Sequence, residues 1–72
     1  MNFKKATDAL LESVTLQKLA DSMGVSVQAV RQARALEGSS AHRPPPKEWA
    51  RAVAALARRQ AAKLEQLADR LS

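Results

Sequence analysis

The apolar positions in the first half of the chain recur three or four residues apart in three short stretches. Residues at that spacing share one side of a helix, so each stretch predicts an amphipathic helix. The first stretch covers residues 2–13, with apolar positions at Phe3, Ala6, Leu10, Leu11 and Val14. Asn2 is the expected N-cap, because its side chain can accept a hydrogen bond from a free backbone N–H of the first turn.

Capping residues bound the second and third stretches. Thr15 and Ser26 are the expected N-caps, and Gly24 and Gly38 are expected to end the two helices, since glycine readily adopts the left-handed backbone found there. The apolar positions are Leu16, Leu19, Ala20 and Met23 in the second stretch, and Val27, Ala29, Val30, Ala33 and Leu36 in the third. The pattern therefore predicts two short helices joined by a tight turn over residues 15–36.

The second half of the chain predicts a loop followed by one long helix. Residues 38–46 end in three prolines, which favour an extended loop, and Pro45 or Pro46 is expected in the first turn of the next helix. Residues 47–71 contain no glycine or proline, so a helix of about 25 residues and about 37 Å is expected. A compact domain of this size is only about 29 Å across. The helix should therefore project from the domain or meet a partner.

The expected fold is all-α and forms a single domain. Residues 1–37 hold three short helices that include a helix-turn-helix, residues 38–46 form the loop, and residues 47–71 form the long helix, which serves packing and dimerisation. Trp49 is expected to pack this helix against the helix-turn-helix. A core this small gives modest stability. In a chain without cysteine, self-association is the expected additional source of stability.

Composition excludes several classes of function. The absence of cysteine excludes disulfides and thiolate metal sites, and the one histidine, His42, cannot form a metal cluster alone. No nucleophile–base pair, carboxylate pair or phosphate-binding glycine loop is present. We therefore expect no enzyme activity, metal, cofactor or small-molecule ligand. No segment predicts a signal peptide or a membrane span, which favours a cytoplasmic location, in the bacterial cytoplasm or nucleoid.

Positive charge is concentrated in the middle of the chain. The net charge is +5, and residues 31–63 contain eight arginines and lysines against two glutamates. Residues 1–30 contain three basic and three acidic residues. A localised basic field favours a polyanion such as nucleic acid. A solvated basic surface that only maintains solubility is the alternative.

The turn between the second and third helices meets specific steric requirements. Ala20 is small where the two helices must cross closely, and Gly24 makes the turn. Val25 fills the corner, and Val30 points back into the core. In this respect the stretch from Leu16 to Leu36 resembles the helix-turn-helix of Cro/CI-type phage repressors and related bacterial regulators. The chain also resembles small regulators of prophages and filamentous phages. One long helix after the motif departs from the five short helices of many members, which leaves the mode of dimerisation open.

The resemblance implies that the third helix enters the major groove of double-stranded DNA. Residues facing away from Val30 and Ala33 would then contact bases: Ser26, Val27, Gln28, Arg31, Gln32 and Ala35. Glutamine can read adenine, arginine can read guanine, and small apolar side chains can touch a thymine methyl. Phosphate contacts are expected from Thr15, Gln17, Lys18, Arg34, Arg43 and Lys47.

A homodimer is expected to form through the long helix. Its proposed interface is an apolar column on one side of the helix: Val53, Leu56, Gln60, Leu64, Leu67 and Leu71. The leading hypothesis is therefore a phage-type repressor that binds a pseudo-palindromic operator, with half-sites about 34 Å apart. Two alternatives remain open. The chain could be a helical protein-interaction module without DNA binding, or a DNA-binding excisionase or antitoxin.

Overall fold

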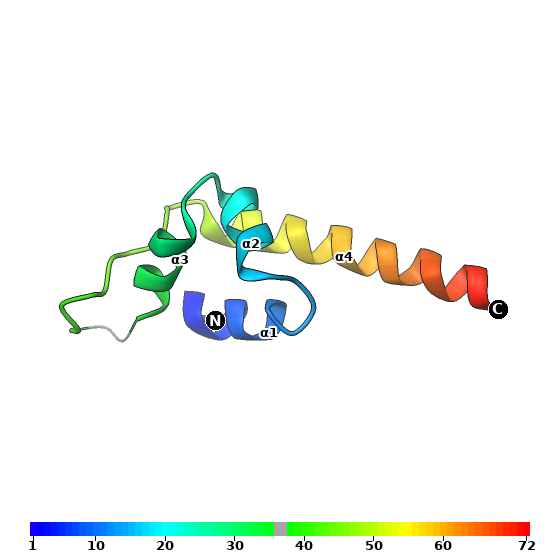
Figure 1. Ribbon diagram of the computed structural model, residues 1–72, viewed down its shortest axis with the longest axis horizontal. Coiled ribbons are helices and arrows are strands. Elements are labelled where there is room, and N and C mark those ends of the chain that lie inside the picture. The colour runs from blue at the N-terminus through cyan, green and yellow to red at the C-terminus, as the bar shows by residue number, and fades with distance from the viewer. Residues whose placement is uncertain (36–37) are drawn as a thin grey trace.

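The computed structural model describes residues 1–35 and 38–72, and these residues form four helices and no strand. The helices are α1 (Phe3–Leu10), α2 (Leu16–Met23), α3 (Val27–Arg34) and α4 (Trp49–Leu71), as Figure 1 shows. The prediction of an all-α chain with three short helices and one long helix is confirmed. Leu36, the predicted end of the helix-turn-helix, and residue 37, the predicted domain boundary, lie outside the described residues.

Local capping sets the helix starts that the sequence predicts. In α1, α2 and α3 the N-cap side chain accepts a hydrogen bond from the backbone N–H three residues later: Asn2 from Lys5 at 2.8 Å, Thr15 from Lys18 at 3.1 Å, and Ser26 from Ala29 at 3.1 Å. Gly24 follows α2 with φ +70°, the left-handed conformation expected at a helix end. These bonds fix where α2 ends and α3 begins, because they satisfy backbone groups that the helices leave free.

Three helix boundaries differ from the predicted ones. α1 ends at Leu10 rather than residue 13, because the chain must turn before Thr15 adopts the extended backbone of an N-cap. α3 ends at Arg34 with Ala35 already extended, so Gly38 lies beyond the helix end. α4 begins at Trp49. The three prolines and Lys47 therefore precede α4, and the carbonyl of Pro46 accepts a hydrogen bond from the N–H of Trp49 at 3.1 Å in the turn just before the helix.

The core lies where α1, α2, α3 and the first half of α4 meet. Leu19, Ala20 and Val30 are fully buried at its centre, and the surrounding buried apolar residues are Phe3, Leu10, Val14, Ala33 and Leu56. Trp49 packs edge-on against Phe3, with ring centroids 5.2 Å apart. Trp49 therefore fixes the start of α4 against α1, beside the helix-turn-helix.

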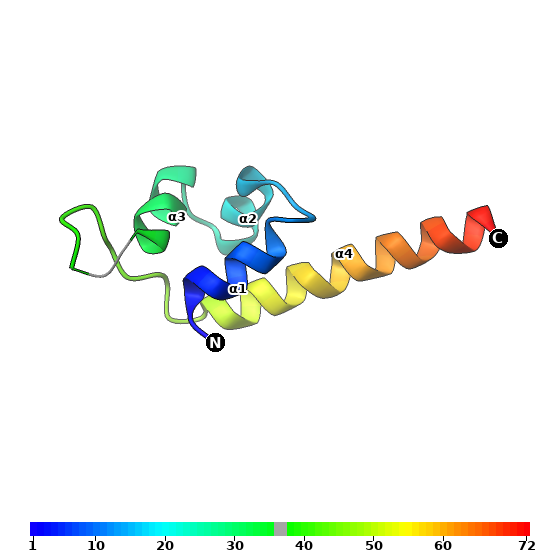
Figure 2. The same ribbon diagram turned by 90° about the horizontal axis from the view of Figure 1, so that it is seen from below.

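The second half of α4 projects from the domain. Every residue from 61 to 72 is exposed, and the molecule measures 50 × 19 × 18 Å along its principal axes. Figures 1 and 2 show the bare end of α4 on one side and α3 near the opposite end. The expectation that the long helix outgrows its domain is confirmed.

The proposed dimer interface on α4 is divided between the core and the surface. Leu56 is 6% exposed and belongs to the core, and Val53 packs partly against the same cluster. Gln60 Nε2 donates a hydrogen bond to the carbonyl oxygen of Ser13 at 3.3 Å. The interface prediction is corrected here, because α1 and α2 already cover this side of α4. Only Leu64, Leu67 and Leu71 of the column are exposed, by 51%, 53% and 79%.

Candidate nucleic-acid interface

α2, the turn at Gly24 and α3 form a closely packed helix-turn-helix. The N–H of Gly24 donates to the carbonyl of Asp21 at 3.2 Å, and the N–H of Val25 donates to the carbonyl of Ala20 at 3.1 Å. Ala20 is fully buried, as its place at the helix crossing requires, and Val25 is half-buried against the core. The steric roles predicted for these residues are confirmed.

The side of α3 opposite the core is polar. Val30 and Ala33 are buried, whereas Gln28 and Arg31 are exposed and Gln32 is half-buried. Helical geometry places Gln28, Arg31 and Gln32 on the outward side, and Gln28 and Gln32 lie one turn apart. Three amide and guanidinium side chains, all able to form bidentate hydrogen bonds, therefore share one face of a short helix.

The other three predicted base contacts lie at the edges of this face. Ser26 is exposed, but its hydroxyl accepts the capping hydrogen bond from Ala29. Val27 packs partly against the core. Ala35 is half-buried, and its carbonyl oxygen lies 2.9 Å from Nδ1 of His42, which must carry the proton in this hydrogen bond. Gln28, Arg31 and Gln32 are therefore the best-presented members of the predicted set.

The loop after α3 returns to the end of that helix. The backbone N–H of Arg43 donates to the carbonyl of Gln32 at 3.1 Å, in addition to the contact of His42 with Ala35. The guanidinium of Arg43 donates to the carbonyls of Ser40 and His42, at 3.1 and 2.7 Å. Arg43 is exposed, so its charge lies in solvent beside the C-terminal end of α3.

Arg34 faces the domain interior, unlike the other predicted phosphate contacts. Its Nε donates to Oγ1 of Thr7 at 3.0 Å, and its guanidinium pairs with the carboxylate of Asp8. The Arg34 side chain is only 25% exposed. A hydrogen bond from Lys4 is the main cause that holds the pKa of Asp8 below its ordinary value of 3.8; desolvation opposes it, and the hydrogen bond from Arg34 lowers the pKa further. Arg34 therefore connects α3 to α1.

Thr7 is not among the residues predicted from the sequence, although a signal for it was present. Thr7 lies four residues after Phe3 and three before Leu10, on the buried face of α1, and it is fully buried. Its hydroxyl donates to the carbonyl of Phe3 at 2.8 Å and accepts from Arg34. A polar residue in an apolar helical column indicates a buried hydrogen bond, and that pattern could have identified it.

The start of α2 presents the remaining predicted phosphate contacts. Thr15, Gln17 and Lys18 lie together in its first turn, and all three are exposed. The Thr15 hydroxyl caps the helix, and Gln17 Nε2 donates to Asp21 at 2.8 Å. Lys47 is exposed in the segment before α4. The structure thus brings Thr15, Gln17 and Lys18 together, while Arg43 and Lys47 lie apart from them on the segment between α3 and α4.

The basic stretch at residues 31–63 does not form one continuous patch. α4 packs along α1 and α2, whereas in the described part of the chain none of its Cα atoms lies within 8 Å of a Cα atom of α3. Arg59 donates to the Ser22 hydroxyl on α2 at 3.3 Å, and Lys63 lies near Lys18 at the same junction. Positive charge is therefore shared between the end of α3, the junction of α2 with α4, and the outer side of α4.

Within residues 1–35 and 38–72, no group of three or more histidine, cysteine or acidic side chains is placed to hold a metal ion. None of the described helices combines the length and apolarity needed to cross a membrane. Comparison with protein-family models, curated proteins and solved structures found no match to this chain. The features that bear on function are therefore the geometry of the helix-turn-helix and the charges around it.

Proposed function

We propose that this chain is a sequence-specific double-stranded DNA-binding transcriptional regulator, of the phage-repressor type, that acts as a homodimer on a pseudo-palindromic operator. The observation that supports this most strongly is the pairing of a rigidly held α3 with an outward face of Gln28, Arg31 and Gln32. A recognition helix needs both properties, because base contacts discriminate only when the backbone that carries them is fixed.

In this proposal α3 lies in the major groove. Arg31 donates to O6 and N7 of a guanine, and Gln28 and Gln32 each make a bidentate amide pair with an adenine. Ser26, Val27 and Ala35 lie at the borders of the face, where Val27 or Ala35 can touch a thymine methyl. Each good bidentate pair contributes about 1–3 kcal/mol of discrimination against the wrong base.

Phosphate contacts in this proposal come from the exposed residues beside α3. Thr15, Gln17 and Lys18 offer a helix start to one phosphate, since its free N–H groups and dipole favour an anion. Arg43 and Lys47 supply positive charge from the loop. Arg34 does not contact phosphate in this arrangement, because its guanidinium is used by Thr7 and Asp8. It positions α3 instead.

Selection of bound sequences from random DNA tests the proposal, followed by mobility shifts of the selected site against random DNA at several salt concentrations. Joint replacement of Gln28, Arg31 and Gln32 by alanine should abolish the preference for the selected site while circular dichroism and melting temperature stay unchanged. A matched control replaces Gln66 and Arg70, exposed near the C-terminal end of α4, and should keep the preference. Failure to select any sequence at physiological salt refutes the proposal.

The protein-interaction module remains the second candidate, and one observation favours it. Leu64, Leu67 and Leu71 are exposed on the projecting part of α4, and exposed leucines in a row commonly mark a surface that binds a protein. A chain that selects no DNA but forms a stable complex through these leucines would support this candidate. An excisionase or antitoxin role would keep the DNA-binding geometry and differ only in the biological response.

A further inference from the structure

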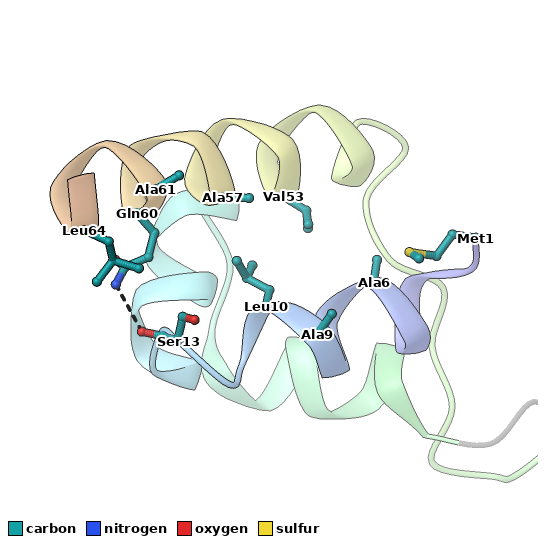
Figure 3. Close-up of a pocket in the computed structure, with 10 residues that line it drawn as sticks. All are labelled: Met1, Ala6, Ala9, Leu10, Ser13, Val53, Ala57, Gln60, Ala61 and Leu64. Carbon is teal, nitrogen blue, oxygen red and sulfur yellow. Dashed lines mark hydrogen bonds between the residues drawn. The ribbon is translucent and has the colours of Figure 1, made fainter. Parts of the chain in front are cut away.

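An apolar groove runs between α1 and α4 at the base of the projecting helix. Figure 3 shows Ala6, Ala9 and Leu10 of α1 facing Ala57 and Ala61 of α4 across it. The groove has a volume of about 370 Å³, with Met1 at one end and Leu64 at the other. Met1 is 92% exposed. Leu64 belongs both to this groove and to the exposed leucines, so the two form one continuous apolar surface.

Short side chains continue from the groove along the outer side of α4. Ala54, Ala57, Ala61 and Ala68 follow one another at intervals of three, four and seven residues, which keeps them on one side of the helix. Alanine extends little from the backbone, so a second helix can approach this side closely. The larger leucines lie beside this alanine row, where they can reach a neighbouring surface.

The edge of α4 beyond the alanine row is positively charged in the first half of the helix and negatively charged in the second half. Arg51 and Arg58 lie on this edge in the first half of the helix, and Glu65 and Asp69 lie on it in the second half, all exposed. Steps of seven and four residues keep these four side chains in line. Arg51 also lies 3.7 Å from Glu48 in an exposed ion pair, which water screens strongly. A basic half followed by an acidic half is complementary to the same edge running in the opposite direction.

We propose that the groove and the alanine row bind a second copy of this chain, whose α4 runs antiparallel and crosses near Ala61. In that register Arg58 lies opposite Glu65 of the second copy, and Arg51 lies near its Asp69; each pair occurs twice by symmetry. A parallel two-fold arrangement would instead place the charged edge of one α4 beside the leucine side of the other, so that no pair between Arg58 and Glu65 could form. The charges therefore select the antiparallel direction.

The same register accounts for the exposed leucines. Leu64 of the second copy reaches Ala57 and the groove, because the residue numbers of facing positions add up to about twice 61 in an antiparallel pair. Leu67 and Leu71 of the second copy lie on the side of its α4 that faces α1, above Ala6, Ala9 and Met1. In this pairing the leucines of each copy are buried against the groove of the other copy, and the groove is covered at the same time.

This inference rests on the homodimer in the proposed function. It replaces the interface that the sequence predicted for that dimer. It does not depend on DNA recognition. α3 lies near the end of the molecule away from the C-terminus, as Figure 2 shows, so pairing through the second half of α4 leaves both α3 faces uncovered. The dimer would carry its two α3 helices toward its opposite ends.

Reversal of one charge in each pair tests the arrangement. Arg58 and Glu65 are seven residues and about 10.5 Å apart along one helix, too far to pair within a chain. Arg58→Glu and Glu65→Arg should each raise the dimer dissociation constant about tenfold or more, since each creates two like-charge contacts in place of two ion pairs. A mixture of the two variants should form heterodimers as tight as the wild-type dimer, because both pairs are then complementary. The double variant should also dimerise normally.

Arg70→Glu is the matched control, since Arg70 lies on the opposite side of α4 and the charge change is identical. Ala61→Glu, at the crossing point, should abolish the dimer while circular dichroism shows an intact helix. Sedimentation over a range of concentrations measures the dimer dissociation constant of the wild type, of the five variants and of the mixture. A wild-type chain that stays monomeric, a mixture that fails to form heterodimers, or an Arg70→Glu effect equal to that of Arg58→Glu each overturns the inference. Loss of DNA selection with correct charge-swap behaviour would refute only the proposed function.

Discussion

Nε of Arg34 donates a hydrogen bond to Oγ1 of Thr7 at 3.0 Å, and this contact joins the last residue of α3 to the middle of α1. Thr7 is fully buried and donates in turn to the carbonyl of Phe3 at 2.8 Å. The orientation of the proposed recognition helix is therefore tied to α1 through one buried hydroxyl, in addition to the apolar packing of Val30 and Ala33.

Thr7→Val should lower the free energy of unfolding by about 1–2 kcal/mol, because it keeps the shape of the side chain but removes a buried hydroxyl that both donates and accepts. Urea denaturation measures the loss. Ser22→Ala, which removes a hydroxyl that contacts Arg59 in an exposed position, is the control and should cost less than about 0.5 kcal/mol. A double-mutant cycle with Arg34→Met should give a coupling of about 1 kcal/mol; zero coupling would contradict the role given to Arg34.

The ion pairs of Asp8 should make part of the stability depend on pH. Lys4 and Arg34 lower the pKa of Asp8 below 3.8 in the folded chain, so its contribution is fully present above the unfolded value and is lost as pH falls through the folded value. Asp8→Asn should therefore reduce the melting temperature near neutral pH, and the difference from wild type should vanish in strong acid. Thermal unfolding measured across the acidic range checks this. A difference that persists unchanged at the lowest pH would contradict it.

Gly24→Ala should destabilise the turn by about 1–2 kcal/mol, because a side chain at φ +70° incurs the cost of the left-handed backbone. A Cβ atom at this position would meet no heavy atom within 4 Å, so the cost arises from the backbone alone. Gly24→Asn should recover part of the loss, since asparagine tolerates this conformation better. Equal melting temperatures for the alanine variant and the wild type would show that the turn relaxes to another conformation.

Alanine substitutions at Leu56 and Leu67 should affect the stability of the monomer very differently, although both leucines belong to one apolar column. Leu56→Ala should destabilise the monomer by about 2–5 kcal/mol through loss of core packing, since the side chain is 6% exposed. Leu67→Ala, at a position 53% exposed, should change monomer stability by less than about 0.5 kcal/mol and weaken the dimer. Thermal unfolding at low protein concentration separates the two effects. Equal losses would contradict the division of α4 into a core half and a projecting half.

Lys18→Ala should weaken binding to the selected operator and to random DNA by a similar factor, and should reduce the slope of log affinity against log salt by about 1. A phosphate contact carries charge but no sequence information, which is the reason for the uniform effect. Titration by fluorescence anisotropy at several salt concentrations measures both quantities. Arg70→Ala, at the far end of α4, is the control and should leave the slope unchanged. A loss confined to the operator would instead place Lys18 at a base edge.

The helix-turn-helix could be predicted from local signals in the amino-acid sequence. The caps at Thr15 and Ser26 and the left-handed turn at Gly24 depend on atoms three or four residues away. The length of α4 was also readable, since residues 47–71 contain no helix breaker. The residues at which the helices end could not be predicted from local signals alone. Ala35 leaves α3 because the loop bonds back to its last turn through His42 and Arg43, a contact between distant segments.

The roles of the side chains along one face of a helix depend on the fold and could not be predicted from spacing. Leu56 and Leu64 look alike in the sequence, yet one is buried and the other is half-exposed, because α1 and α2 cover α4 only as far as Gln60. Arg34 looked like another cation of the basic stretch until the fold placed it against Thr7 and Asp8. Spacing fixes which residues share a side of a helix, whereas burial and pairing depend on which helix lies across that side.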